Sequence, residues 1–165
     1  AWGILKNYIP VCKMALKTHS STAVEKYSQE TADKCVPLDS ELIKEAIPLF
    51  TQIHHCGSVL AEVFFAMMIS RILYGSVPAP GTMVIFSILL ATCSIGTPGL
   101  PWGTVMVSLG TLTGILKFGD SGVALMFAVF ALNDAFAAAC NATCDGAAAL
   151  FLTGYVKRHD FSNRL

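Results

Sequence analysis

The chain has 165 residues, of which 54% are hydrophobic and 13% are charged, and its formal net charge is zero. Globular proteins are usually about a quarter charged, so this composition disfavours a soluble domain, and the lack of a basic stripe gives nucleic-acid binding no support. Between residues 76 and 154 the formal charges are Lys117, Asp120, Asp134 and Asp145. We therefore expect an all-α membrane protein whose C-terminal half is embedded in the membrane.

The N-terminal part of the chain predicts a short helical hairpin over residues 13–36. A mildly apolar stretch leads to Ser20-Ser21-Thr22, which would form the tip, and residues 23–45 are polar, of mixed charge and broken at Pro37. The second arm is more polar than a lipid-facing arm should be. Either this arm stays hydrated or the first hairpin is degenerate.

A long apolar stretch over residues 41–74 predicts a helix, with Asp39 or Ser40 placed to cap its start. Its middle reads His54-His55-Cys56-Gly57-Ser58, a polar run that predicts a broken helix rather than a continuous one. The stretch ends at a turn rich in proline and glycine over residues 76–81.

The next segment, residues 83–118, predicts a re-entrant helical hairpin with its tip at residues 96–103. Each arm has about 13 residues, roughly 20 Å of helix, against a hydrocarbon core of about 30 Å. Two glycines and two prolines between Gly96 and Pro101 exclude one continuous helix. Backbone groups at such a tip are tolerated at membrane depth only where they line a polar cavity, as in secondary transporters.

The last apolar block, residues 122–156, is long enough to cross a membrane and carries a polar stripe. Asp134, Asn141 and Asp145 lie within about 40° of one another around a helix. An ionisable residue in a membrane segment is by default a hypothesis for a functional site. We therefore expect the stripe to face a polar cavity near the 96–103 tip. The alternative is that these aspartates lie at the wet edge of a soluble helix.

The segments Ser94–Pro101 and Asn141–Asp145, the latter preceded by Asp134, closely resemble motifs of the dicarboxylate/amino acid:cation symporter family, the glutamate transporter-like proteins. Ser20-Ser21-Thr22 is similar to the serine-rich first tip of that family. The order hairpin, helix, hairpin, helix is also the same. The resemblance covers about residues 13–158 and implies a single partial transport-core domain over residues 1–165.

The resemblance also implies roles for individual residues. Asp134 would accept the α-ammonium group of an amino acid, Asn141 would bind its α-carboxylate, and Asp145 would be a sodium ligand. The 96–103 tip would close over the substrate as a gate. The positions implied in substrate binding are Asp134, Asn141, Ala137, Ser21, Gly96, Thr97, Pro98 and Gly99, and those implied in sodium binding are Asp145 and Asn141. No cofactor is expected beyond a sodium ion as the possible coupling ion.

Two departures from the family pattern bear on specificity and coupling. Ala137 stands where members with acidic substrates have an arginine that grips the second carboxylate, so we expect a neutral amino acid as substrate. The Asn-Met-Asp-Gly-Thr motif of the family aligns with His54–Ser58, which puts Cys56 in the place of the acid. Because a thiol is a poor sodium ligand, we expect weak sodium coupling, with His54 or His55 serving proton coupling or packing.

We therefore expect a secondary transporter, or its transport core, as a multi-pass protein of the cell membrane. Its partners would be membrane lipid, a small amino acid, a cation, and a scaffold half or a homotrimer, because the scaffold helices of the family have no counterpart here. One alternative is a non-transporting remnant or interaction protein of the same family. Another is metal handling by His54, His55, Cys56, Cys140 and Cys144. No nucleophile motif such as Gly-x-Ser-x-Gly is present, so we do not expect an enzyme.

Overall fold

The computed structural model describes residues 2–35, 40–95, 97 and 103–159, and the side chains from residue 6 onward. These residues form helices and no strands, which confirms the all-α expectation for the described part of the chain. The elements are α1 (Trp2–Thr18), the 3-10 helix η1 (Thr22–Val24), α2 (Glu25–Asp33), α3 (Ser40–Ile53), α4 (Cys56–Tyr74), α5 (Pro80–Ser94), α6 (Gly103–Gly114) and α7 (Asp120–Arg158).

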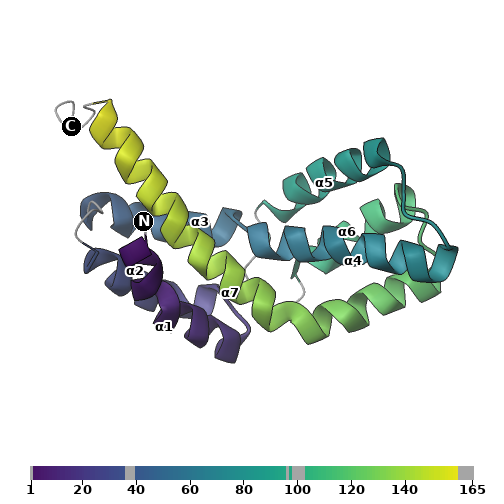
Figure 1. Ribbon diagram of the computed structural model, residues 1–165, viewed down its shortest axis with the longest axis horizontal. Coiled ribbons are helices and arrows are strands. Elements are labelled where there is room, and N and C mark those ends of the chain that lie inside the picture. The colour runs from purple at the N-terminus through teal and green to yellow at the C-terminus, as the bar shows by residue number, and fades with distance from the viewer. Residues whose placement is uncertain (1, 36–39, 96, 98–102, 160–165) are drawn as a thin grey trace.

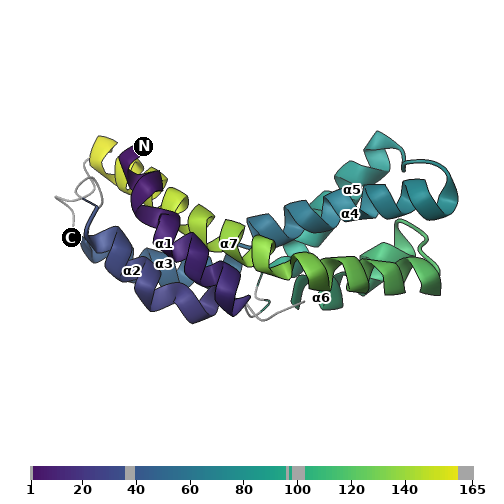
Figure 2. The ribbon, with the colours of Figure 1, turned by 60° about the horizontal axis from the view of Figure 1, so that its bottom comes forward.

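The helices form two groups that are joined along α7. Figures 1 and 2 show α1, α2 and α3 around the C-terminal half of α7, and α4, α5 and α6 around its N-terminal half. Helix α7 therefore runs through the whole molecule, at about 58 Å for its length.

Helix α1 begins at Trp2, well before the start of the expected first hairpin, residues 13–36. Tyr8, Val11 and Ala15 recur at helical spacing and are all buried, so one face of this segment packs inward from its start. The chain then turns through residues 19–21 and returns as η1 and the polar helix α2.

Helices α5 and α6 pack against each other as the two arms of a helical hairpin, in the region where the sequence predicts a re-entrant hairpin over residues 83–118. Helix α5 starts at Pro80, in the first turn, where the N–H that proline lacks would have no intrahelical acceptor. Helix α6 ends at Gly114. The arms have 15 and 12 residues, about 22 and 18 Å, so each is shorter than a hydrocarbon core of about 30 Å. The site positions expected at Gly96, Pro98 and Gly99 lie outside the described residues.

Two segments of the described chain are long and apolar enough to cross a membrane: Ser40–Tyr74 and Asp120–Arg158. The first contains α3 and α4, which are separated by His54 and His55. The second is α7, which is one continuous helix. These segments are the candidate membrane-spanning parts of the fold.

The buried apolar residues form two separate clusters, and α7 contributes to both. One cluster joins α1, α2 and α3 with Ala139, Ala142 and Ala149 of α7. The other joins α4, α5 and α6 with Met126, Phe130 and Ala137 of α7. The change from one cluster to the other thus falls between Ala137 and Ala139, which lies between the polar positions Asp134 and Asn141 of α7.

Candidate functional site

The site is built around the break between α3 and α4. Helix α3 ends at Ile53 and α4 begins at Cys56, while His54 N donates to Phe50 O at 2.7 Å and Val59 N donates to His55 O at 2.9 Å. Helix ends leave backbone carbonyl and amide groups without intrahelical partners. The break therefore places acceptors of α3 and donors of α4 at one point inside the fold.

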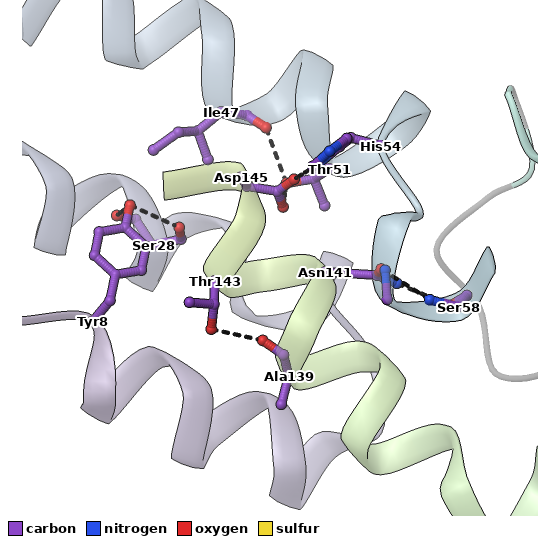
Figure 3. Close-up of polar contacts among 11 residues, drawn as sticks. Tyr8, Ser28, Ile47, Thr51, His54, Ser58, Ala139, Asn141, Thr143 and Asp145 are labelled. Atoms are coloured by element: carbon purple, nitrogen blue, oxygen red, sulfur yellow. Dashed lines mark hydrogen bonds and ion pairs between the residues drawn. The ribbon is translucent and has the colours of Figure 1, made fainter. Parts of the chain in front are cut away.

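Asn141 of α7 caps the N-terminus of α4. Its Oδ1 accepts hydrogen bonds from Gly57 N at 2.8 Å and from Ser58 N at 3.3 Å, and its Nδ2 donates to Ser58 Oγ at 3.0 Å. Figure 3 shows this side chain pointing from α7 toward the first turn of α4. The amide thus supplies partners that the helix start lacks, and it does so from a buried position.

Gly57 allows α4 to approach α7 closely enough for this cap to form. A Cβ atom at this position would lie 2.4 Å from Cys140 Cβ and 2.6 Å from the Ala137 carbonyl oxygen. Non-bonded carbon atoms prefer a separation of about 3.5–4.0 Å, so only glycine fits here without movement of the helices.

Asp145 lies on the other side of the break, against the end of α3. Its side chain is 2% exposed; Oδ1 is 3.3 Å from His54 Nδ1, and Oδ2 is 3.1 Å from Thr51 Oγ1. Figure 3 shows Asp145 pointing from α7 toward the end of α3. A buried carboxylate is costly unless it is paired and hydrogen-bonded, and His54 and Thr51 provide these contacts.

The 96–103 tip also contacts the break. His55 Nε2 lies 2.8 Å from the carbonyl oxygen of Thr97, and the hydroxyl of Thr97 donates to Cys93 O at 3.2 Å. Thr97 is buried, as is His55. The break between α3 and α4, the polar part of α7 and the described residue of the tip therefore meet in one region.

The other positions expected in the site lie as follows. Asp134, Asn141 and Asp145 are all buried on one face of α7, which contradicts the alternative of a wet helix edge. Asp134 lies about 10 Å along the helix from Asn141, and Ala137 lies between them and is buried as well. Ser21 is buried at the turn that precedes η1, where its carbonyl accepts a bond from Val24 N at 3.2 Å.

A groove of about 520 Å³ opens beside the break, between α4 and α5. Its lining includes His54, His55 and Cys56 of the break and Ser94 of α5. Asp134, Asn141 and Asp145 are not part of this lining, so the groove is a different space from the polar cavity expected at the stripe.

Glu62 is a buried acid that the sequence analysis missed. It lies on α4, has an exposed fraction of 0% and accepts a hydrogen bond from Ser108 of α6. Its surroundings are the apolar cluster formed by α4, α5 and α6. An acid inside an apolar helix was the available signal, because intramembrane ionisable residues are functional candidates by default.

The metal-handling alternative finds no geometric support in the described residues. Across residues 2–35, 40–95, 97 and 103–159, no three His, Cys, Asp or Glu side chains are placed to hold one metal ion. The metal-binding cluster that this alternative requires of His54, His55, Cys56, Cys140 and Cys144 is therefore not formed in the described residues.

A broken helix, a helical hairpin with short arms and a buried polar stripe meet at helix ends, which is the arrangement from which secondary transporters build their sites. The family model described as the sodium:dicarboxylate symporter family matches residues 1–154, and the chain belongs to this family. Its members are cation-coupled membrane transporters, which accords with transport rather than catalysis. A comparison with curated protein sequences finds no match.

Proposed function

We propose that the chain is the transport core of a secondary transporter that moves a small neutral amino acid together with a cation across the cell membrane. The observation that carries this proposal is the way α7 holds both sides of the helix break. Asn141 bonds to the start of α4, and Asp145 contacts the end of α3. Sites of secondary transporters form where discontinuous helices expose backbone groups beside polar side chains.

The proposed substrate class follows from the charges that the site offers. Asp134 would pair with the ammonium group of the amino acid, and the positive end of the α4 dipole, together with Asn141, would favour its carboxylate. Ala137 provides no positive charge for a second carboxylate. Burying such a carboxylate without a partner would be strongly unfavourable, so alanine or serine should bind better than aspartate or glutamate.

The cation would lie near Asp145. Hard cations take oxygen ligands. The Asp145 carboxylate and the Thr51 hydroxyl offer such oxygens, and Thr51 Oγ1 lies 3.1 Å from Asp145 Oδ2. Because the buried carboxylate needs a positive partner, the chemistry of these residues fits a sodium ion. Cys56, in the place of the second acid, would make the coupling weaker than in relatives that keep this acid.

The arms of the α5–α6 hairpin fit a re-entrant position, since neither can cross a bilayer alone. Its tip would gate the site through the contact between His55 and Thr97. A scaffold half or a homotrimer would supply the surface against which the core moves. Membrane lipid would cover the exposed apolar side chains of α4, α5 and α7, such as Leu60, Ile88 and Leu132.

The test is binding to the purified chain in lipid nanodiscs, with and without any scaffold partner. Alanine, serine, aspartate and glutamate are compared in sodium chloride and in choline chloride. We expect alanine or serine to bind, and Asp134→Asn to remove this binding while the chain stays folded. A preference for aspartate or glutamate would refute the substrate class.

Absence of any amino-acid binding under all conditions would refute the transport proposal. The alternative of a non-transporting remnant or interaction protein would then be favoured. Ala137→Arg serves as the matched specificity variant, because it returns a guanidinium to the position and should shift binding toward aspartate.

A further inference from the structure

His54 holds the oxygen of Asp145 that a coupling cation would need. We propose that His54 is a built-in competitor for the cation position at Asp145, and that it thereby sets the sodium affinity of the chain. The inference rests on the proposed cation-coupled function. It goes beyond it by naming the residue that regulates the cation site.

The pairing of Asp145 supports this view. The Asp145 side chain is 2% exposed, and a carboxylate so deeply buried requires a positively charged partner or a hydrogen-bond donor. The Thr51 hydroxyl has a single proton, and it lies 2.9 Å from the Ile47 carbonyl as well as 3.1 Å from Asp145. Among the described residues, His54 is therefore the main donor to this carboxylate, and its Nδ1 lies 3.3 Å from Oδ1.

The position of His54 makes the contact reversible. The residue lies in the two-residue break and belongs to neither α3 nor α4, and its side chain is 35% exposed. Its ring borders Phe50 edge-on, with centroids 6.4 Å apart, and it also lines the groove beside the break. The ring can therefore leave Asp145 without unfolding a helix.

The ring and a cation cannot both use Oδ1 in full. A cation binds a carboxylate oxygen at about 2.4 Å, and the N–H of the ring points its positive end at the same oxygen. This conflict exists for the neutral ring as well as for the charged ring, because both can donate through Nδ1. Sodium binding thus requires that His54 moves away.

The experiment measures sodium affinity without using transport. The thermal unfolding of the full chain in detergent is followed while sodium chloride replaces choline chloride at constant ionic strength, because a ligand of the folded state raises the unfolding temperature. His54→Asn is compared with the unmodified chain. We expect the sodium concentration for half-maximal stabilisation to fall by about tenfold, which corresponds to about 1.4 kcal/mol.

Three further variants define the result. His159→Asn changes an exposed histidine at the end of α7 and should leave the sodium response unchanged. The double variant His54→Asn with Asp145→Asn should lose the gain, and His54→Gln repeats the test if His54→Asn does not fold. A sodium response in His54→Asn and His54→Gln within about twofold of the unmodified chain would overturn the proposal.

Failure of the proposed function gives a different result from failure of this inference. If no amino acid binds but His54→Asn still gains sodium affinity, the transport proposal fails and the competitor role stands. If alanine or serine binds and the sodium affinity does not change in either His54 variant, the competitor role fails alone.

Discussion

Replacing Gly57 by alanine tests whether the close contact between α4 and α7 holds the site together. The added Cβ would lie 2.4 Å from Cys140 Cβ and 2.6 Å from the Ala137 carbonyl oxygen. Both neighbours belong to the helix α7 itself and not to the end of a flexible side chain. The two helices must therefore separate by about 1 Å to reach normal contact distances.

The separation has a second cost, which can be worked from the cap. The Gly57 amide lies 2.8 Å from Asn141 Oδ1, so a shift of about 1 Å stretches this bond beyond hydrogen-bonding range. Overpacking costs about 1–3 kcal/mol, and a buried polar group left unsatisfied costs about 1–3 kcal/mol. We expect Gly57→Ala to lower the free energy of unfolding by about 2–6 kcal/mol.

Chemical unfolding of the detergent-solubilised chain, followed by circular dichroism, measures this loss. Gly110→Ala is the matched control, because Gly110 lies inside α6 with nothing within 4 Å of an added Cβ. This control should be neutral or stabilising by up to about 1 kcal/mol, since alanine favours helix more than glycine does. If Gly57→Ala unfolds within about 0.5 kcal/mol of the unmodified chain, a size below ordinary core effects, the contact does not hold the two helices together as described.

Substitutions at three other positions have expected outcomes. Asn141→Ala removes the cap of α4 and should cost about 2–3 kcal/mol of stability. Asn141→Asp keeps an acceptor for the Gly57 amide and should cost less. Thermal unfolding ranks the two variants, and equal stability would contradict the capping role. Glu62→Gln can still bond to Ser108 and should stay close to the unmodified chain, while Glu62→Ala should cost about 2–4 kcal/mol by leaving a cavity, as judged by the same unfolding assay. Gly146→Ala would place a Cβ 2.4 Å from the ring of Tyr8, so α1 should detach from α7 and become susceptible to limited proteolysis; unchanged cleavage would argue against this packing.

The helical class of the fold was predictable because its signals are local. Apolar composition, the sparse charges after residue 76 and the turns rich in glycine and proline require no knowledge of distant contacts. The resemblance to symporters rested on short motifs at Ser94–Pro101 and Asn141–Asp145, and the family match over residues 1–154 agrees with it. The expected first hairpin began at residue 13, whereas α1 begins at Trp2, and the buried residues of its first turns alternate with lysines along the sequence.

The partners of the polar residues were not predictable from the sequence, because they lie far away along the chain. Helical periodicity placed Asn141 and Asp145 on one face, but not against the two ends of a break that precedes them by more than 80 residues. The same holds for Glu62, whose partner Ser108 lies on another helix. Periodicity indicates which face of a helix is buried and does not indicate what that face meets.

The place of α7 at the end of the described chain has a consequence for synthesis in the cell. The contacts between α7 and the break join residues 83 to 94 positions apart, from Ser58 with Asn141 to Thr51 with Asp145. Until α7 has left the ribosome, α4 lacks its cap, and both apolar clusters lack the residues that α7 contributes. The site at the break therefore cannot form until Asn141 and Asp145 have been synthesised, after all the other helices of the described chain.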